Sequence, residues 1–167
     1  MFIDETGTAL NMILPYGRAL KGERAVGTRP VSKGQRISVI GAMSSKGLEA
    51  CMTFEGTLNG EVFLSYLRDV LCPVLRKGHI VITDNAKAHK VAGVKEIIEG
   101  RGAELIYLPP YSPDLSPIEL CWGKIKHFLK KAQSRTKEAL NEAISEALNR
   151  ITRNDSEGWF GHCGYVV

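Results

Sequence analysis

Three acidic residues stand where carboxylates could take part in chemistry. Asp84 ends a β-branched run, Asp4 ends a shorter apolar run, and Glu119 lies at the start of an amphipathic segment. If the three converge, their like charges are unfavourable together unless cations neutralise them. Ligands that are all oxygen select Mg²⁺ or Mn²⁺, and two such ions about 4 Å apart can activate a water and stabilise the leaving oxygen in phosphodiester cleavage. These residue types therefore predict metal-dependent phosphoryl transfer on a nucleic acid.

The two aspartates also have a structural explanation. An aspartate at a strand end is a common turn former, and this alternative applies to both Asp4 and Asp84. In an open α/β sheet, however, the crevice beyond the C-terminal strand ends is where ligands bind. Considered one at a time, these positions are compatible with a turn or with a binding site.

Glu119 has a sharper structural alternative. Ser116 and Glu119 have the spacing of a capping box just before an apolar run, and this pattern alone favours capping. Helical geometry places Glu119 just outside the apolar stripe, in a column with Lys126 and Lys130. Its carboxylate could therefore border a crevice with a basic rim, although lysines near a helix C-terminus also occur as a solvated face.

The first third of the chain is predicted to consist mostly of strands. Apolar runs predict strands over residues 1–4, 9–14 and 37–43. A turn over 44–47 then joins the last of these to a return strand over 48–54. These strands would form the antiparallel part of a sheet.

The second part of the chain alternates helices and strands. Apolar residues at every third or fourth position predict a helix that begins at Asn59 and ends at Lys77. A strand buried on both faces follows over 79–84, then a helix over 91–99 and a second buried strand over 105–108. Strands followed by α/β units predict an α/β fold with a mixed sheet.

A proline-rich loop over 109–117 precedes the last helices. Ser116 is a good N-cap and Pro117 suits the first helical position, so an amphipathic helix is predicted to start there. Another helix is predicted from Thr136. We predict one domain over 1–153 and a C-terminal tail over 154–167 that packs loosely or joins a neighbouring chain.

The composition is that of a folded globular protein. Hydrophobic residues make up 44% and charged residues 24%, which argues against disorder and fibrous repeats. The formal charge of +4 suits a polyanionic partner but is weak evidence alone. The four cysteines form no CxxC pair, and no apolar run approaches the roughly 20 residues of a membrane span. We expect a cytoplasmic protein that does not enter a membrane.

Three segments resemble a known family: FIDETG around Asp4, ITDNAKAHK around Asp84, and YLPPYSPDLSPIELCWGKIK around Glu119. Together they resemble the catalytic domain of mariner-like bacterial insertion-sequence transposases, within the RNase H-like superfamily of transposases and retroviral integrases. The resemblance covers almost the whole chain. It includes the 34 residues between Asp84 and Glu119, a separation typical of this branch of the family.

The resemblance implies an RNase H-like mixed five-stranded sheet flanked by helices. It also implies that Asp4, Asp84 and Glu119 are the catalytic, metal-binding residues, with Mg²⁺ as the cofactor and Mn²⁺ as a possible substitute. Asp4 would bridge two ions, and Asp84 and Glu119 would each complete one site. Asn85 and His89 match the DNAxxH part of the motif and would position phosphate or the attacking hydroxyl. His89 could alternatively be an ordinary residue at a helix N-terminus.

The family also implies partners. These are DNA, as transposon ends and target, and a second copy of the chain, because transposition pairs two element ends. Such transposases carry helix-turn-helix modules that recognise the element ends, and we expect that module to be absent here, since the chain begins three residues before Asp4. Three explanations are open: the chain is the product of a second reading frame, a trimmed catalytic domain, or the remnant of a decayed element. The expected location is the bacterial cytoplasm, in association with the nucleoid.

The main functional hypothesis is therefore DNA cleavage and strand transfer during transposition. A second enzyme hypothesis is an RNase H or junction resolvase of the same fold, which the motif spacing disfavours. The non-enzyme hypothesis is a catalytically silent fragment that assembles with other chains or binds DNA through basic residues, namely Lys124, Lys126, Lys130, Lys131 and Arg135.

Overall fold

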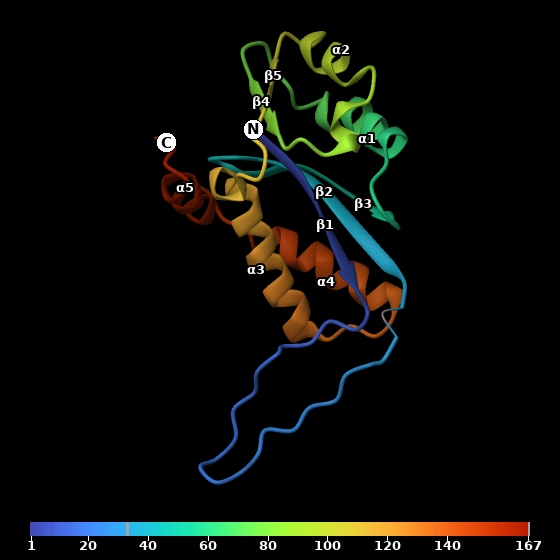
Figure 1. Cartoon of the computed structure of the whole chain (residues 1–167), viewed down its shortest axis with the longest axis vertical. Coiled ribbons are helices and arrows are strands. Elements are labelled where there is room, and N and C mark those ends of the chain that lie inside the picture. The colour runs from blue at the N-terminus through green and yellow to red at the C-terminus, as the bar shows by residue number, and fades with distance from the viewer. Residues whose placement is uncertain (33, 167) are drawn as a thin grey trace.

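The computed structural model describes residues 1–32 and 34–166 and contains one five-stranded mixed sheet (Figure 1). Its strand order is β3-β2-β1-β4-β5. The strands are β1 (Phe2–Ala9), β2 (Arg36–Ser44), β3 (Gly47–Glu55), β4 (Ile80–Thr83) and β5 (Glu104–Tyr107). The first three pair antiparallel, whereas β4 and β5 run parallel to β1. The predicted mixed five-stranded sheet is confirmed.

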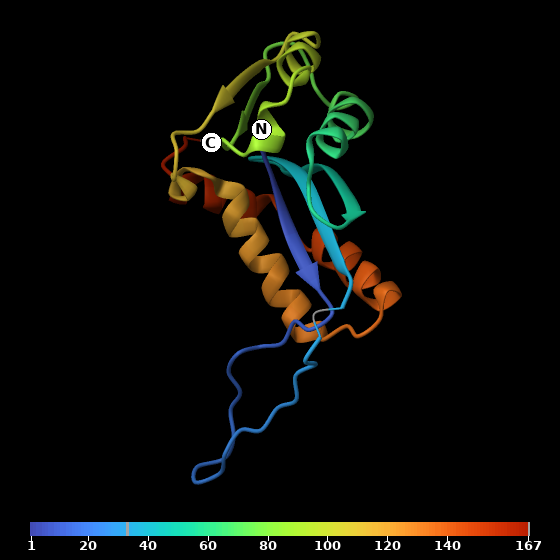
Figure 2. The same ribbon diagram turned by 45° about the vertical axis from the view of Figure 1, so that its right-hand side comes forward.

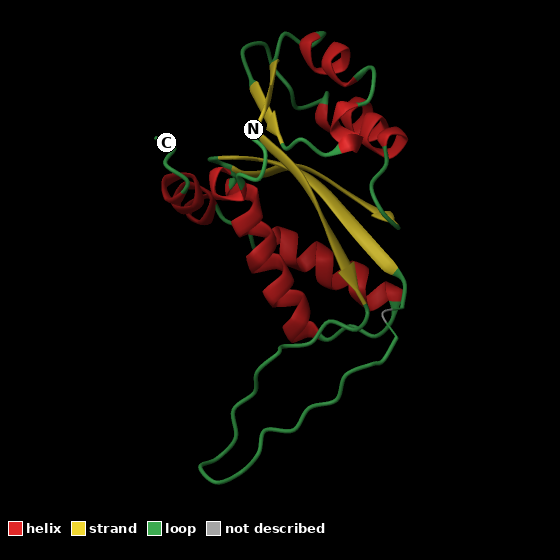
Figure 3. Ribbon diagram, viewed as in Figure 1, coloured by secondary structure: helices red, strands yellow, loops and turns green. Residues whose placement is uncertain are grey.

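Helices cover both faces of the sheet (Figure 3). One face packs against α3 (Pro117–Ala132), α4 (Lys137–Asn149) and α5 (Arg153–His162). The opposite face packs against α1 (Gly60–Tyr66), a π-helical turn η1 (Leu67–Leu71) and α2 (Val94–Glu99). Two short 3₁₀ helices complete the fold, η2 (Lys87–Lys90) and η3 (Pro113–Leu115). Alternation along β1 explains the two cores, because Phe2 lies in one and Ile3 in the other.

Strand β1 is longer than the sequence predicted, and the predicted strand over 9–14 is wrong. The polar residues after Asp4 do not end the strand, because every residue of β1 pairs with β2, from Phe2 opposite Met43 to Ala9 opposite Arg36. The buried Thr8 hydroxyl donates to the Ile37 carbonyl at 2.7 Å. This pairing outweighs the polar composition, so Asp4 lies within a strand rather than at its end.

A long loop takes the place of the predicted second strand. Residues 13–32 are almost entirely exposed, and the loop extends away from the layered body in two views (Figures 1 and 2). It exposes several apolar side chains that the sequence pattern could not assign to a core: Tyr16, Leu20, Val26 and Val31.

The predicted helices are largely confirmed, with shifted boundaries. The first becomes α1 followed by η1, and it ends before Pro73. The helix predicted over 91–99 is shorter, because Gly93 adopts a left-handed backbone with φ of 96° and α2 begins at Val94. Helix α4 starts as predicted, where the Thr136 hydroxyl accepts from the Ala139 N–H at 3.2 Å.

The C-terminal segment forms a packed helix rather than a loose tail. The Thr152 side chain and Asp155 form a reciprocal capping box that starts α5 one residue before the predicted boundary at 153/154. Phe160 and Tyr165 then pack around Phe2, with ring centroids 5.5 and 5.1 Å from the Phe2 ring. Residue 167 lies outside the described residues. Within the described part of the chain, no helix is both long and apolar enough to cross a membrane.

Candidate active site

Asp4, Asp84 and Glu119 line one cavity of about 400 Å³. Asp4 is in β1, and Asp84 directly follows the neighbouring parallel strand β4, whose Thr83 pairs with Ile3. Glu119 lies in the first turn of α3. The proline-rich loop from Leu108 to Ser116 forms the other wall. The three carboxylates therefore share one cavity at one end of the β1–β4 pair.

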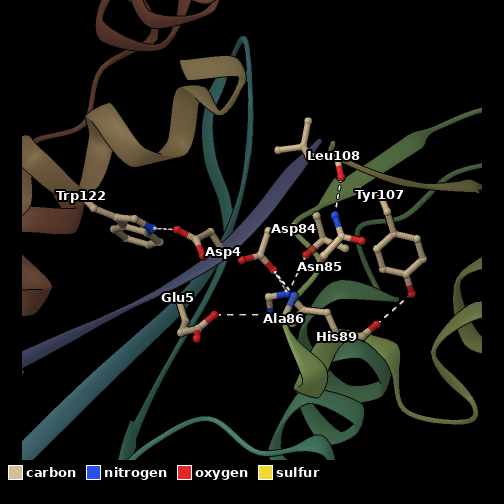
Figure 4. Close-up of polar contacts among 10 residues, drawn as sticks. Asp4, Glu5, Asp84, Asn85, Ala86, His89, Tyr107, Leu108 and Trp122 are labelled. Carbon is tan, nitrogen blue, oxygen red and sulfur yellow. Dashed lines mark hydrogen bonds and ion pairs between the residues drawn. The ribbon is translucent and has the colours of Figure 1, made fainter. Parts of the chain in front are cut away.

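Asp4 is held by a neutral donor. The indole Nε1 of Trp122 donates to Asp4 Oδ2 at 2.9 Å (Figure 4). Burial is the largest cause that raises the pKa of Asp4 to about 7. The negative charges of Glu119, Glu5 and Asp84 act in the same direction. Asp4 is thus a carboxylate that its surroundings orient but do not neutralise.

Asp84 is held by a cationic partner. His89 Nδ1 lies 2.6 Å from Asp84 Oδ1, and the same oxygen accepts the Ala86 N–H at 2.9 Å. The hydrogen bond from His89 is the largest cause that lowers the pKa of Asp84. The contact with Ala86 is the turn that the sequence offered as an alternative, so Asp84 forms the turn and also faces the cavity.

His89 is completely buried within the short helix η2. Its ring packs against the Phe63 ring at a tilt of 43°, with 4.5 Å between centroids, and Nδ1 lies 2.9 Å from the Thr83 hydroxyl. Nε2 lies 3.4 Å from Glu5 Oε2. Burial opposes protonation, but the hydrogen bond to Asp84 and the nearby Glu5 carboxylate raise the pKa of His89 to about 9.

Glu5 and Trp122 complete the site, although the sequence did not single out either. Glu5 comes directly after the predicted strand over 1–4, and Trp122 lies within the predicted amphipathic helix. Their positions next to predicted site residues could have identified them, because Glu5 follows Asp4 and Trp122 comes one helical turn after Glu119. The contacts of Trp122 with Asp4 and of Glu5 with His89 join segments far apart in the sequence, so local patterns could not reveal them.

Glu119 does not take part in a capping box in the described structure. The Ser116 side chain makes no capping hydrogen bond, and the Glu119 N–H bonds to the Ser116 backbone carbonyl at 3.1 Å instead. The exposed Glu119 side chain lines the cavity. The structural alternative is therefore wrong, and the carboxylate is available to the site.

The other predicted contact residues are placed differently. Asn85 lines the cavity, and its side-chain amide donates to the Leu108 carbonyl. Lys124 is tied to α5 by an ion pair of 2.5 Å with Asp155. Lys126 is half-buried and borders a separate hollow beside β1, and Lys130 is also half-buried. Positioning of phosphate by Asn85 and DNA contact by the lysines stay predictions.

The donor set of the cavity fits a divalent cation. It consists of carboxylate oxygens, which Mg²⁺ and Mn²⁺ prefer, and a cation would relieve the repulsion that raises the pKa of Asp4. As the side chains stand, no group of three His, Cys, Asp or Glu residues within 1–32 and 34–166 is close enough to hold an ion. The three carboxylates share a cavity without forming a ready-made cluster.

The sheet order, the helices on both faces and the position of the cavity define an RNase H-like fold with an acidic site. The sequence model of the DDE superfamily endonucleases matches residues 1–141, so the chain belongs to this family.

Solved structures of Mos1 transposase share the fold. A pre-cleavage Mos1 transpososome matches with a TM-score of 0.81 and 18% identity, over 97% of this chain and 52% of that chain. The Mos1 mariner paired-end complex with Mn matches with a TM-score of 0.73 and 18% identity, over 97% and 51%. The Mos1 catalytic domain matches with a TM-score of 0.64 and 14% identity, over 97% and 76%. The chain thus spans about half the length of the Mos1 chains in the complexes. No curated protein sequence matches it.

Proposed function

We propose that this chain is a transposase catalytic domain, which cleaves DNA phosphodiester bonds and joins the freed ends to target DNA. The observation that carries the proposal is the shared cavity of Asp4, Asp84 and Glu119, contributed by β1, the end of β4 and the start of α3. Membership of the DDE superfamily endonucleases supports it, as does the likeness to Mos1 complexes with transposon ends.

Asp4, Asp84 and Glu119 would hold the metal, with Mg²⁺ as the natural ion and Mn²⁺ as a substitute. Solved Mos1 complexes with Mn and with Mg support this choice. When bound, two such ions activate the attacking water or hydroxyl and stabilise the leaving oxygen. DNA ends, target DNA and a second copy of the chain are the proposed partners.

The chain's own residues would prepare the site for this reaction. His89 would hold the Asp84 carboxylate and balance its charge, while the Ala86 N–H donates to the same oxygen of Asp84. Asn85 holds the loop after β5 through the Leu108 carbonyl, which keeps the proline-rich wall in place. Such preorganisation is the usual contribution of a protein to phosphoryl transfer.

The test is nicking of supercoiled plasmid in the presence of Mg²⁺ or Mn²⁺. We expect nicking that EDTA abolishes and that Asp84→Asn reduces by about 100-fold or more, because a ligand of the metal is lost. Asp69→Asn is the matched control, since Asp69 is an exposed carboxylate in η1 outside the cavity. Metal-dependent cleavage that survives Asp84→Asn would disprove the proposed site.

A second candidate function is DNA binding without cleavage. It is favoured by the net charge of +4 and by the basic residues in the last turn of α3, Lys130 and Lys131. Its signature is DNA affinity that falls steeply with salt, together with no nicking at any Mg²⁺ or Mn²⁺ concentration. The same plasmid assay, run beside a filter-binding series in increasing NaCl, separates the two functions.

A further inference from the structure

Trp122 donates a hydrogen bond to the Asp4 carboxylate of the candidate site. It is 1% exposed, and its indole N–H points at Asp4 Oδ2 from 2.9 Å (Figure 4). A buried indole N–H requires an acceptor, and this one is a carboxylate 118 residues away in the sequence. The alternative explanation is that Trp122 is a large core residue whose indole N–H is satisfied by the nearest acceptor.

The surroundings of the ring argue for more than packing. Gly41 is the cross-strand partner of Asp4, and a Cβ at Gly41 would lie 3.1 Å from Trp122 Cη2. The missing side chain in β2 therefore leaves the space through which the indole reaches Asp4. A side chain at this position would press on the tip of the ring and shift its N–H.

The type of donor also matters. An indole is a neutral donor, so it orients the Asp4 carboxylate without cancelling the charge that a cation would need. His89, in contrast, both orients and neutralises Asp84. Trp122 also lies one turn after Glu119 on α3, so the same helix carries one carboxylate and holds another.

We propose that Trp122 is a positioning residue for the metal site: its indole N–H sets the orientation of Asp4 and fixes α3, with Glu119, against β1. The inference rests on the proposed function. It predicts that loss of the N–H weakens metal binding even when the core stays packed. Residues that orient a metal ligand in this way typically contribute about 10- to 100-fold to metal affinity.

The first experiment uses the two indole N–H signals of the ¹⁵N-labelled protein, which contains only Trp122 and Trp159. Trp159→Phe assigns them and serves as the matched control, because Trp159 is a partly buried residue of α5 at the edge of the core. We expect the Trp122 signal to move when Asp4 is changed to Asn without metal, and to move saturably when Mg²⁺ is added. The Trp159 signal should stay in place in both cases. A role in packing alone would leave the Trp122 signal insensitive to Mg²⁺.

The second experiment measures Mn²⁺ affinity by isothermal titration calorimetry. Trp122→Phe keeps an aromatic ring but removes the donor, and we expect about tenfold weaker binding. Gly41→Ala should weaken binding in the same direction by a smaller factor, and Trp159→Phe should leave it unchanged. Unchanged affinity in Trp122→Phe would overturn the inference while leaving the metal site intact.

Failure of the proposed function has a different signature. The unmodified protein should bind Mn²⁺ or Mg²⁺ saturably, and Asp84→Asn should remove that binding. If either result is not observed, both the metal site and the role of Trp122 are disproved. If Trp122→Phe does not fold, the indole signals of the unmodified chain decide, because they require no substitution at Trp122. A Trp122 signal that ignores both Asp4→Asn and Mg²⁺ then rejects the inference.

Discussion

Asp4 lies in β1 and Asp84 directly follows the neighbouring parallel strand β4, yet their surroundings shift the pKa of the two carboxyls in opposite directions. Asp84 is exposed and paired with the imidazole of His89, and its pKa is lowered. Asp4 is half-buried and held by a neutral indole, and its pKa is raised to about 7. The fold stabilises the ionised form of Asp84, whereas the ionised form of Asp4 lowers the stability of the folded chain. That contrast implies that a cation would stabilise the charge of Asp4 more than that of Asp84.

The largest effect that probes this contrast is expected from His89→Ala. The substitution removes a fully buried ring that contacts Phe63, and it leaves Asp84 and Glu5 without their common partner. We expect the free energy of unfolding to fall by about 3 kcal/mol, measured by urea denaturation at pH 7. His127→Ala is the control, because His127 is exposed on α3. A loss below about 1 kcal/mol would mean that the ion pairs around His89 contribute little.

A smaller effect of opposite sign is expected from Asp4→Asn. In the folded chain Asp4 holds its proton up to about pH 7, whereas an unfolded aspartate releases it near pH 3.8. The contribution of Asp4 to stability is therefore greatest below pH 3.8 and is lost as the pH rises toward 7. Asparagine has no such dependence and can still accept from Trp122. We expect the metal-free variant to be about 2 kcal/mol more stable at pH 8, after allowance for solvent screening.

The measurement for Asp4→Asn is a pair of denaturation curves for the variant and the unmodified chain at each pH from 4 to 8. Their difference should be near zero at pH 4 and should grow up to about pH 7. Added Mg²⁺ should stabilise the unmodified chain and leave the variant unaffected, since ligands stabilise only the state that binds them. A variant that is less stable at pH 8 would contradict the view that Asp4 is uncompensated.

The smallest effect is expected from Asp84→Asn. The variant keeps an oxygen to accept from His89 but loses the charge, and Asp84 is largely exposed, so a loss of about 1 kcal/mol is expected near pH 7. The effect should disappear at low pH, because a carboxyl whose pKa is lowered stabilises the fold only while it is ionised. Thermal unfolding of Asp4→Asn and Asp84→Asn, measured side by side, gives the direction in which each substitution shifts the melting temperature. Shifts in the same direction at pH 7 would remove the contrast between the two aspartates.

The sequence by itself determined the fold class, the order of most elements and the three carboxylates. Buried strands and amphipathic helices are encoded by local periodicity, and Glu119 directly follows a loop whose prolines exclude both helix and strand. The motif around Asp4 also located β1, although not its length. Local interactions are sufficient to predict an element of secondary structure where its pattern repeats within a few residues.

Only the tertiary structure decided what surrounds those carboxylates. The contact of Trp122 with Asp4 and that of His89 with Glu5 join residues more than 80 positions apart. The full pairing of β1 with β2 overrode a polar stretch, and the absence of a capping bond from Ser116 in the described structure left Glu119 facing the cavity. The reason is the same in each case. Hydrogen-bond partners and dielectric surroundings depend on which strands and helices become neighbours, and that is a property of the packed sheet rather than of any local segment.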